Sequence, residues 1–279
     1  MPKLRLMSNN QWKNDENLWE ELGLDCSAAT RARGFAEAYA ELAPDVVGLQ
    51  EVSGKMIEEL MERLAEKATP FALLWGRDTP ILYRSDKFEL LDSRHALYPD
   101  GVPGLDGIYN NKKTKSYTIA HFRCKEDGKR FVFVSTHLWW KSSNPESRSY
   151  YPGSDEARAY QIELVIAEID RFCREQSCPV VIVGDFNTRY DSKVIEYAKS
   201  RGFSHAHDVA TEYADETNGH HPCGKSGYMP YEPKPFVCGI DHILVRDCPS
   251  DFVRRFDRYY PDSFLPLSDH FPLYIDVEF

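Results

Sequence analysis

The stretch that decides the fold is VVIVGDFNT, which runs from Val180 to Thr188. Its first half is a run of β-branched apolar residues, which favours a buried strand. Its second half places a glycine, a carboxylate and a carboxamide directly after that run, at Gly184, Asp185 and Asn187. Because loops at strand ends hold side chains on a rigid frame, this arrangement is typical of a functional site.

The composition is that of a folded, acidic protein. The chain has 279 residues, of which 42% are hydrophobic and 13% aromatic, so it can bury a large core. It carries 34 Lys and Arg against 44 Asp and Glu, and the net charge of −10 repels long polyanions unless the basic residues cluster. We therefore do not expect tight binding to duplex DNA.

No stretch has the length and apolar character of a signal peptide or of a membrane span. We expect a cytoplasmic monomer without a membrane span. Seven cysteines in a chain of this size favour reduced thiols, several of them buried as small apolar residues. A disulfide between Cys223 and Cys238 stays open as an alternative.

Apolar runs with a period of two, or with no period, alternate with segments of helical period along the whole chain. This pattern predicts a single α/β domain over residues 1–279. An Asp-Gly pair in KEDGK predicts a hairpin between YTIAHFRC and RFVFVSTHL. The other predicted strands are Leu4–Ser8, Asp45–Gln50, Pro179–Val183, FALLW, PILYR, FELLD, GIDHILV, DFVRRFDRYY and FPLYIDVEF, and the predicted helices are Arg31–Leu42, Lys55–Lys67 and Asp155–Glu175.

Polar groups recur at the ends of these predicted strands. Each one alone has an ordinary explanation as a cap, a turn or a satisfied core residue, but their coincidence indicates one site. In an extended segment, residues i and i+2 face the same side, so the two polar residues of GDFN are expected to serve that site together. The strand-end groups are Asn9, Asn10, Gln50, Glu51, Thr136, His137, Asp185, Asn187, Asp241, His242, Asp269 and His270.

The chemistry of this set favours a hard cation. Carboxylates with Asn and His, without a cage of thiolates, suit Mg²⁺ or Mn²⁺ better than Zn²⁺. Such an ion polarises a phosphoryl oxygen, while a histidine paired with a carboxylate moves protons near neutral pH. The set therefore predicts phosphoryl chemistry.

The ordered motifs SNNQW, LQEV, STHL, GDFNT, GIDHIL and LSDHFPL resemble the endonuclease/exonuclease/phosphatase superfamily, which has the deoxyribonuclease I-like fold. The resemblance spans Asn10 to His270, and GDFN and SDHFPL in this order are its specific signals. It implies a four-layered α/β sandwich with two packed mixed β-sheets. It also implies metal-dependent hydrolysis of a phosphoester.

The resemblance implies a metal site in which Glu51 is the principal ligand. Asn10 would lie beside Glu51, and Asp269 would support the same Mg²⁺ or Mn²⁺.

The resemblance also implies the catalytic roles. Asp185 would position or deprotonate the attacking water, and Asn187 would bind the phosphate or orient Asp185. His137 would contact a phosphoryl oxygen or the leaving group. His270, oriented by Asp241, would act as general base or stabilise the transition state, and His270 and Asp185 can exchange these roles.

Two positions depart from parts of this pattern. Abasic-site nucleases of the superfamily carry an acid where this chain has Trp12, which argues against a repair nuclease. Deoxyribonuclease I-like enzymes pair a carboxylate with the first catalytic histidine, and Asp78 in WGRDTPILYR matches that carboxylate only loosely.

Substrate selection is expected in three irregular stretches. In THLWWKSSNPESRSYYPGSDEAR, Trp139 and Trp140 either stack on a base or sugar beside Lys141, Arg148 and Arg158, or cover the sheet edge. Both interpretations stay open at this point.

The second stretch, ETNGHHPCGKSGYMPYEPKPF, offers His220 and Lys225 as phosphate contacts. A zinc site of His220, His221, Cys223 and Cys238 is the alternative, although the spacing is irregular.

The third stretch, YNNKKTKSY, carries Lys112, Lys113 and Lys115, for which a solvated turn is favoured over a phosphate-facing patch.

The sequence thus predicts a Mg²⁺- or Mn²⁺-dependent phosphodiesterase or phosphatase with a small or single-stranded phosphoester substrate. A nuclease on DNA or RNA and a catalytically silent binding module on the same fold are the alternatives. None of the predicted catalytic residues is missing, which favours an enzyme.

Overall fold

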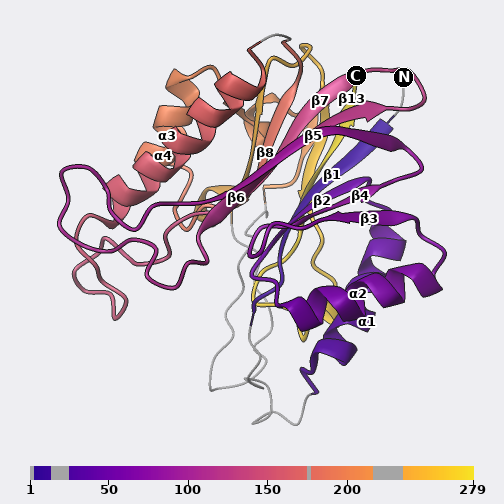
Figure 1. The fold of residues 1–279 in the computed structure, drawn as a ribbon, viewed down its shortest axis with the longest axis horizontal. Helices are drawn as coiled ribbons and strands as arrows, with labels where there is room; N and C mark the ends of the chain where they lie inside the picture. The colour runs from indigo at the N-terminus through magenta and orange to yellow at the C-terminus, as the bar shows by residue number, and fades with distance from the viewer. Residues whose placement is uncertain (1–2, 14–24, 175–176, 216–234) are drawn as a thin grey trace.

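Two β-sheets lie face to face, and helices cover the outer face of each (Figure 1). The structure is a computed structural model, and it describes residues 3–13, 25–174, 177–215 and 235–279. The helices are α1 (Ala28–Leu42), α2 (Gly54–Glu66), α3 (Ser154–Phe172), α4 (Lys193–Ser200) and α5 (Ala206–Val209), with 3₁₀ turns η2 (Phe236–Cys238) and η3 (Asp262–Phe264).

Within the described ranges, one sheet has seven strands in the order β10-β12-β13-β1-β2-β4-β3, and the other has six in the order β5-β6-β7-β8-β11-β9. Both are mixed, because β1 pairs parallel with β2 and antiparallel with β13, and β8 pairs parallel with β7 and antiparallel with β11. The strands are β1 (Lys3–Asn10), β2 (Val46–Gln50), β3 (Phe71–Leu74), β4 (Ile81–Arg84), β5 (Phe88–Leu97), β6 (Ser116–Cys124), β7 (Arg130–His137), β8 (Val180–Asp185), β9 (Ser204–His205), β10 (Glu212–Tyr213), β11 (Asp241–Arg246), β12 (Val253–Arg258) and β13 (Leu273–Glu278).

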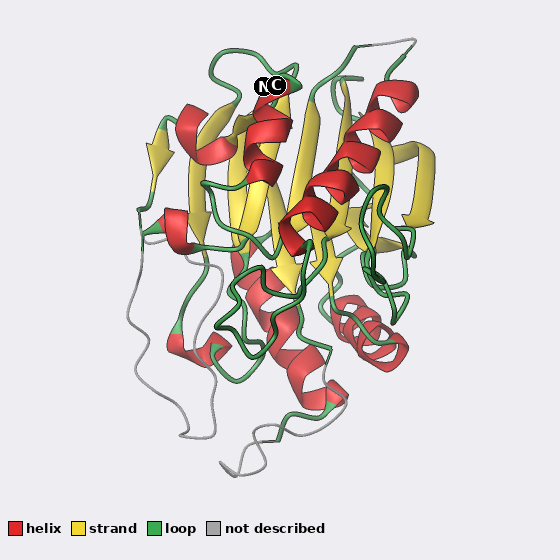
Figure 2. Ribbon diagram, turned by 90° about the vertical axis from the view of Figure 1, so that its left-hand side faces the viewer, coloured by secondary structure: helices red, strands yellow, loops and turns green. Residues whose placement is uncertain are grey.

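The predicted four-layered sandwich is confirmed. Helices α1 and α2 pack on the outer face of the seven-stranded sheet, and α3 and α4 pack on the outer face of the six-stranded sheet. A third apolar cluster fills the space between the sheets. Figure 2 shows the strands aligned roughly along one common axis, with both chain termini at one end.

Strand β8 explains why the opening stretch is apolar on both faces. Val181 and Val183 face the cluster between the sheets, while Val180 and Ile182 face α3 and α4. Because side chains alternate along a strand, Asp185 falls on the same side as Val181 and Val183, in the space between the sheets.

The space between the sheets becomes polar toward the end that carries Asp185. Ser8 donates to Gln50 (3.2 Å), Gln50 donates to Ser135 (3.1 Å), and Ser135 donates to the carbonyl of Leu49 (2.9 Å). These buried groups satisfy one another across the two sheets, so the inner faces carry polar side chains where the strands approach the site.

Strand β5 is longer than the predicted FELLD segment, because it continues to Leu97 and pairs with β6 along its whole length. It lies at the sheet edge, where many of its side chains are exposed, so it lacks the apolar alternation that sequence analysis detects. Helix α3 ends at Phe172, before the predicted end at Glu175, which lies outside the described residues.

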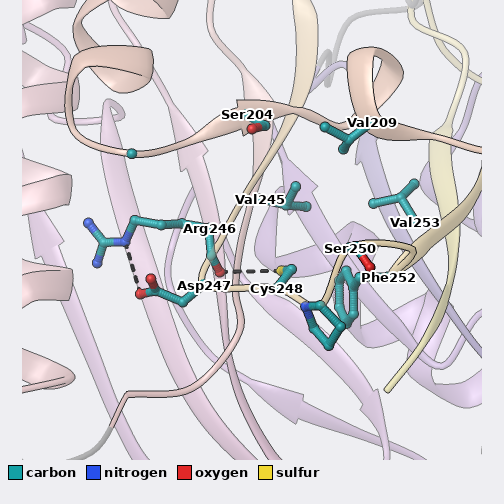
Figure 3. A pocket seen from close by; sticks show the side chains of 11 residues that line it. Ser204, Val209, Val245, Arg246, Asp247, Cys248, Ser250, Phe252 and Val253 are labelled. Atoms are coloured by element: carbon teal, nitrogen blue, oxygen red, sulfur yellow. Dashed lines mark hydrogen bonds and ion pairs between the residues drawn. The ribbon is translucent and has the colours of Figure 1, made fainter.

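A cavity of about 250 Å³ lies at the other end of β11 (Figure 3). Val245, Arg246, Cys248 and Phe252 line it, and the Cys248 thiol donates to the carbonyl of Arg246 (3.3 Å). The strand from Asp241 to this end spans roughly 17 Å, so the cavity is separate from the polar end of the sheets.

The cysteines of the described ranges are free thiols, and Cys223 lies outside those ranges. In the part of the chain that the structure describes, no helix combines the length and the apolar character needed to cross a membrane.

Gly184→Ala is expected to destabilise the protein strongly. An alanine Cβ at this position would lie 2.0 Å from the carbonyl oxygen of Thr136, on the neighbouring strand. Because both atoms belong to rigid strands, we expect a loss of about 3 kcal/mol or more in the free energy of unfolding, measured by urea denaturation. Gly54→Ala is the matched control, because no atom lies within 4 Å of its added Cβ. Equal stability of the two variants would contradict the tight approach of β7 and β8.

Candidate active site

Polar side chains from both sheets converge where the inner faces end. The residues predicted as catalytic or metal-binding are linked there by short contacts, and they are joined by Asp78, which the sequence matched only loosely, and by Lys115. His242, the strand-end residue after Asp241, lies on the opposite face of its sheet against Phe186. The seven-stranded sheet and its loops supply Asn10, Glu51, Asp78, Asp269 and His270, and the six-stranded sheet and its loops supply Lys115, His137, Asp185, Asn187 and Asp241.

Asp185 lies at the centre of this cluster. Its Oδ2 accepts a hydrogen bond from the Asn10 side chain (3.1 Å), and lies 3.5 Å from Nε2 of His137 and 3.9 Å from Nε2 of His270. Its Oδ1 accepts a hydrogen bond from the backbone N–H of Asn187 (2.8 Å). Both oxygens of Asp185 are therefore held in fixed directions.

The pKa of Asp185 lies below its usual value although the residue is buried. Burial raises this pKa, but the positive charges of His270, His137 and Lys115 lower it by more. Asp185 is therefore a carboxylate at neutral pH.

His137 is held by the carboxylate of Asp78. Its Nδ1 lies 2.7 Å from Oδ2 of Asp78, and its Nε2 lies 3.6 Å from Oε1 of Glu51. Burial raises the pKa of Asp78, but the hydrogen bond and charge of His137 bring it below its usual value. The loose sequence match at Asp78 therefore corresponds to a direct contact with the histidine.

His270 is held in the same way by Asp241. Its Nδ1 lies 2.7 Å from Oδ2 of Asp241, and both residues are buried. Burial lowers the pKa of His270, but the carboxylates of Asp241 and Asp269 raise it well above its usual value. Burial raises the pKa of Asp241 to about 6, although His270 lowers it in part.

The donor set fits a divalent cation. Ligand atoms of Glu51, His137 and Asp185 lie within 4.8 Å of one another. Asp269 supplies a buried oxygen, Oδ1, with no hydrogen-bond partner. An unpartnered buried carboxylate oxygen beside other carboxylates is typical of a site for a hard cation. The side-chain oxygen of Asn10 accepts a hydrogen bond from the backbone N–H of Trp12 (2.8 Å).

Asn187 differs from the extended geometry that the sequence predicts. Strand β8 ends at Asp185, and Asn187 has a left-handed backbone with φ 52°. The side-chain amide of Asn187 donates to the carbonyl of Leu138 (3.2 Å). Phe186, between Asp185 and Asn187 in the sequence, is fully buried, and its N–H donates to the carbonyl of Ile240 (2.9 Å). A tight turn, rather than strand alternation, thus brings Asn187 to Asp185.

The favoured expectation of a solvated turn is wrong for Lys115, for which a phosphate-facing patch was the alternative. The residue is only 5% exposed, and its Nζ lies against the ring of His137, 3.2 Å from Nδ1 and closer to Nε2. The expectation holds for Lys112 and Lys113, which are exposed. The hairpin register is the signal that could have identified Lys115, because Ser116 lies opposite His137.

The two tryptophans after His137 have different environments. Trp139 is 2% exposed and packs against Tyr109, while Trp140 is 41% exposed with the Lys141 ammonium 4.1 Å above its ring. Arg158 is buried and donates to the carbonyls of Trp139 (3.1 Å) and Lys141 (2.7 Å). Covering the core is therefore the role of Trp139, and Trp140 is available to a ligand.

The predicted contacts from the later loop cannot be placed. His220, His221, Cys223 and Lys225 lie outside the described residues.

Comparisons with known proteins agree with this fold. The chain belongs to the endonuclease/exonuclease/phosphatase family, whose sequence profile matches residues 17–270. Members of this family are phosphoester hydrolases. The protein resembles Protein angel of Drosophila melanogaster, with 28% identity over 179 residues, 60% of this chain and 46% of that protein. It also resembles the CCR4-Not complex 3'-5'-exoribonuclease subunit Ccr4 of Debaryomyces hansenii, with 24% identity over 231 residues, 68% of this chain and 26% of that protein. The chain thus spans less than half of the length of these two relatives.

Solved structures share the fold over the whole chain. An endonuclease/exonuclease/phosphatase from Bacteroides vulgatus has a TM-score of 0.75 and 24% identity, and covers 100% of this chain and 99% of its own. The mannosyl-6-phosphatase of Bacteroides thetaiotaomicron has a TM-score of 0.73 and 20% identity, and covers 99% of this chain and 100% of its own.

Proposed function

We propose that the protein is a Mg²⁺- or Mn²⁺-dependent phosphoester hydrolase that acts on a small or single-stranded substrate. The observation that carries this proposal is the pair of histidines that point Nε2 toward Asp185, each fixed from behind by a buried carboxylate. This arrangement suits proton transfer and charge stabilisation on both sides of one phosphoryl group.

The side chains have distinct tasks in this proposal. Asp185 orients the attacking water and accepts its proton. Asp241 fixes the ring of His270, which accepts the proton of the attacking water or donates to the oxygens that gain negative charge in the transition state. His137, held by Asp78, contacts a phosphoryl oxygen or the leaving group.

Asn187 orients Asp185 through its backbone N–H. It contacts the phosphate through the second N–H of its side-chain amide, which the bond to Leu138 leaves unused. Glu51 and Asp269 would hold the cation beside Asn10. A bound Mg²⁺ or Mn²⁺ supplies polarisation of a phosphoryl oxygen.

The substrate class is supported by charge and by one exposed ring. The net charge of −10 disfavours long duplex polyanions. Trp140 lies three residues after His137, Arg158 donates to the carbonyls of the residues on either side of it, and its exposed ring offers a surface on which a base or sugar can stack. The named activities of Ccr4 and of the mannosyl-6-phosphatase, on RNA and on a sugar phosphate, are both compatible with such a surface.

A metal-dependent nuclease on DNA or RNA is the nearest alternative, and a catalytically silent binding module is the other. The site retains every predicted catalytic side chain in contact with its neighbours, which supports an enzyme. We further propose that residues 1–279 form one domain and that the protein works as a monomer in the cytoplasm.

A panel of phosphoesters tests this function directly. Hydrolysis of nucleotides, single-stranded RNA and DNA, sugar phosphates, inositol phosphates and lipid headgroups is measured with Mg²⁺ and with Mn²⁺. We expect activity on at least one class, its loss in a chelator and its return when the cation is restored. Full activity after exhaustive chelation would contradict the metal site. Glu51→Gln is the matched variant, because it removes the ligand charge and keeps the side-chain shape.

Binding to duplex DNA distinguishes the proposed function from a nuclease that acts on duplex DNA. We expect weak binding even at low salt, because the net charge of −10 repels a long polyanion. Nanomolar affinity for duplex DNA at physiological salt would favour the nuclease.

A further inference from the structure

Two buried histidines outside the proposed chemistry lie behind the turn that carries Asp185 and Asn187. His205 and His242 are each 1% exposed. His242 follows Asp241 in β11, so its side chain points to the opposite face of the sheet. There its ring contacts Phe186, with 5.3 Å between the ring centroids.

The hydrogen bonds of these histidines form a chain with a fixed direction. The backbone N–H of His207 donates to Nδ1 of His205 (3.2 Å), and Nε2 of His205 lies 3.1 Å from Nδ1 of His242. Nε2 of His242 lies 2.8 Å from the carbonyl oxygen of Thr188. A backbone N–H only donates and a carbonyl only accepts, so both rings are neutral with the proton on Nε2.

The surroundings support neutral rings at both positions. Burial lowers the pKa of His242 to about 4 and that of His205 well below its usual value. The chain of hydrogen bonds therefore persists at neutral pH without a counter-ion.

The chain ends on the turn that holds the catalytic groups. Thr188 directly follows Asn187, which has a left-handed backbone. This conformation is uncommon for a residue other than glycine, so contacts on both sides of Asn187 must hold the turn in place. The backbone N–H groups of Phe186 and Asn187 hold the first part of the turn through their hydrogen bonds. The carbonyl of Thr188 is held instead by the side chain of His242, on strand β11. A single substitution at His242 removes that hydrogen bond and leaves the backbone contacts in place.

We propose that His242, supported by His205, is a positioning residue that holds the Thr188 carbonyl and thereby keeps Asp185 and Asn187 in their catalytic geometry. This inference rests on the hydrolase function proposed above. A displacement of about 1 Å at a reacting group costs on the order of a hundredfold in rate, so the hydrogen bond matters more to kcat than to folding.

Three variants test the proposal by kinetics. His242→Leu removes the donor and fills the space, and His242→Gln keeps an N–H group that can reach Thr188. We expect His242→Leu to lower kcat by about tenfold or more with KM within about twofold, and His242→Gln to recover most of that loss. His121→Leu is the control, because His121 is a half-buried histidine of β6 that packs on Phe172 of α3. It is expected to keep its kcat.

Hydrogen exchange tests the same proposal without any substrate. The N–H of Asn187 is bonded to Asp185 in the wild type, so we expect it to exchange slowly. We expect about tenfold faster exchange in His242→Leu, recovery in His242→Gln, and unchanged exchange at Ile182 in the middle of β8.

The outcomes separate this proposal from the proposed function. A wild type that hydrolyses no phosphoester contradicts the hydrolase function, while the exchange of Asn187 still decides whether His242 holds the turn. Unchanged exchange in His242→Leu overturns the positioning role. Faster exchange with unchanged kcat in an active enzyme overturns it as well.

Discussion

Asp241→Asn is expected to lower kcat by roughly a hundredfold or more while changing KM little. Asp241 lies 2.7 Å from Nδ1 of His270 and fixes the orientation of its ring. The asparagine keeps the shape of the side chain but loses the charge that favours the protonated ring. Because the protonated ring would donate to oxygens that gain negative charge in the transition state, we expect the loss to appear in kcat.

His270→Ala is expected to cost at least as much as Asp241→Asn. The double variant should be scarcely slower than His270→Ala, because the two residues act as one unit. Steady-state kinetics and melting temperatures for the three variants decide the matter. Fully additive losses, or lower melting temperatures with kcat retained per folded molecule, would indicate a structural role for the pair.

Lys115→Met is expected to lower kcat by about a hundredfold, the effect of removing one preorganised donor from a site of this kind. The Lys115 ammonium lies against the ring of His137 and lowers the pKa of Asp185. Its loss removes positive charge from the place where phosphoryl oxygens gain negative charge. Methionine keeps most of the buried length, so the fold should persist.

Lys112→Met is the matched control for Lys115→Met. Lys112 is exposed and lies in the same loop, so this variant should keep both kcat and KM. Equal activity of the two variants would show that the ammonium of Lys115 only fills space.

Much of the fold could be predicted because the signals are local. The run Val180–Val183 is apolar on both faces, which predicts a strand between two layers, and strand alternation then predicts the side on which Asp185 falls. The edge strand β5 could not be delimited in this way, because its exposed positions carry no apolar alternation.

The parts of the site that were missed, or that the sequence matched only loosely as at Asp78, depend on contacts between distant segments. Asp78 and His137 are 59 residues apart in sequence, and their contact exists only after the two sheets pack. Lys115 looks like one of three solvated lysines until the hairpin register brings Ser116 opposite His137. The turn at Asn187 could not be predicted, because the residue at which a strand ends depends on its hydrogen bonds to neighbouring segments. Here the N–H of Phe186 is bonded to the carbonyl of Ile240.

Three of the hydrogen-bonded pairs at the site join the two sheets. Asn10 with Asp185, Asp78 with His137, and Asp241 with His270 all cross the interface. Ligand affinity and sheet docking are therefore thermodynamically linked. A cation or phosphate bound here stabilises the docked sheets by an amount that grows with the logarithm of its concentration. By the same linkage, substitutions that loosen the apolar contact between the sheets, far from any reacting atom, weaken binding at the site once they leave a substantial fraction of the molecules undocked.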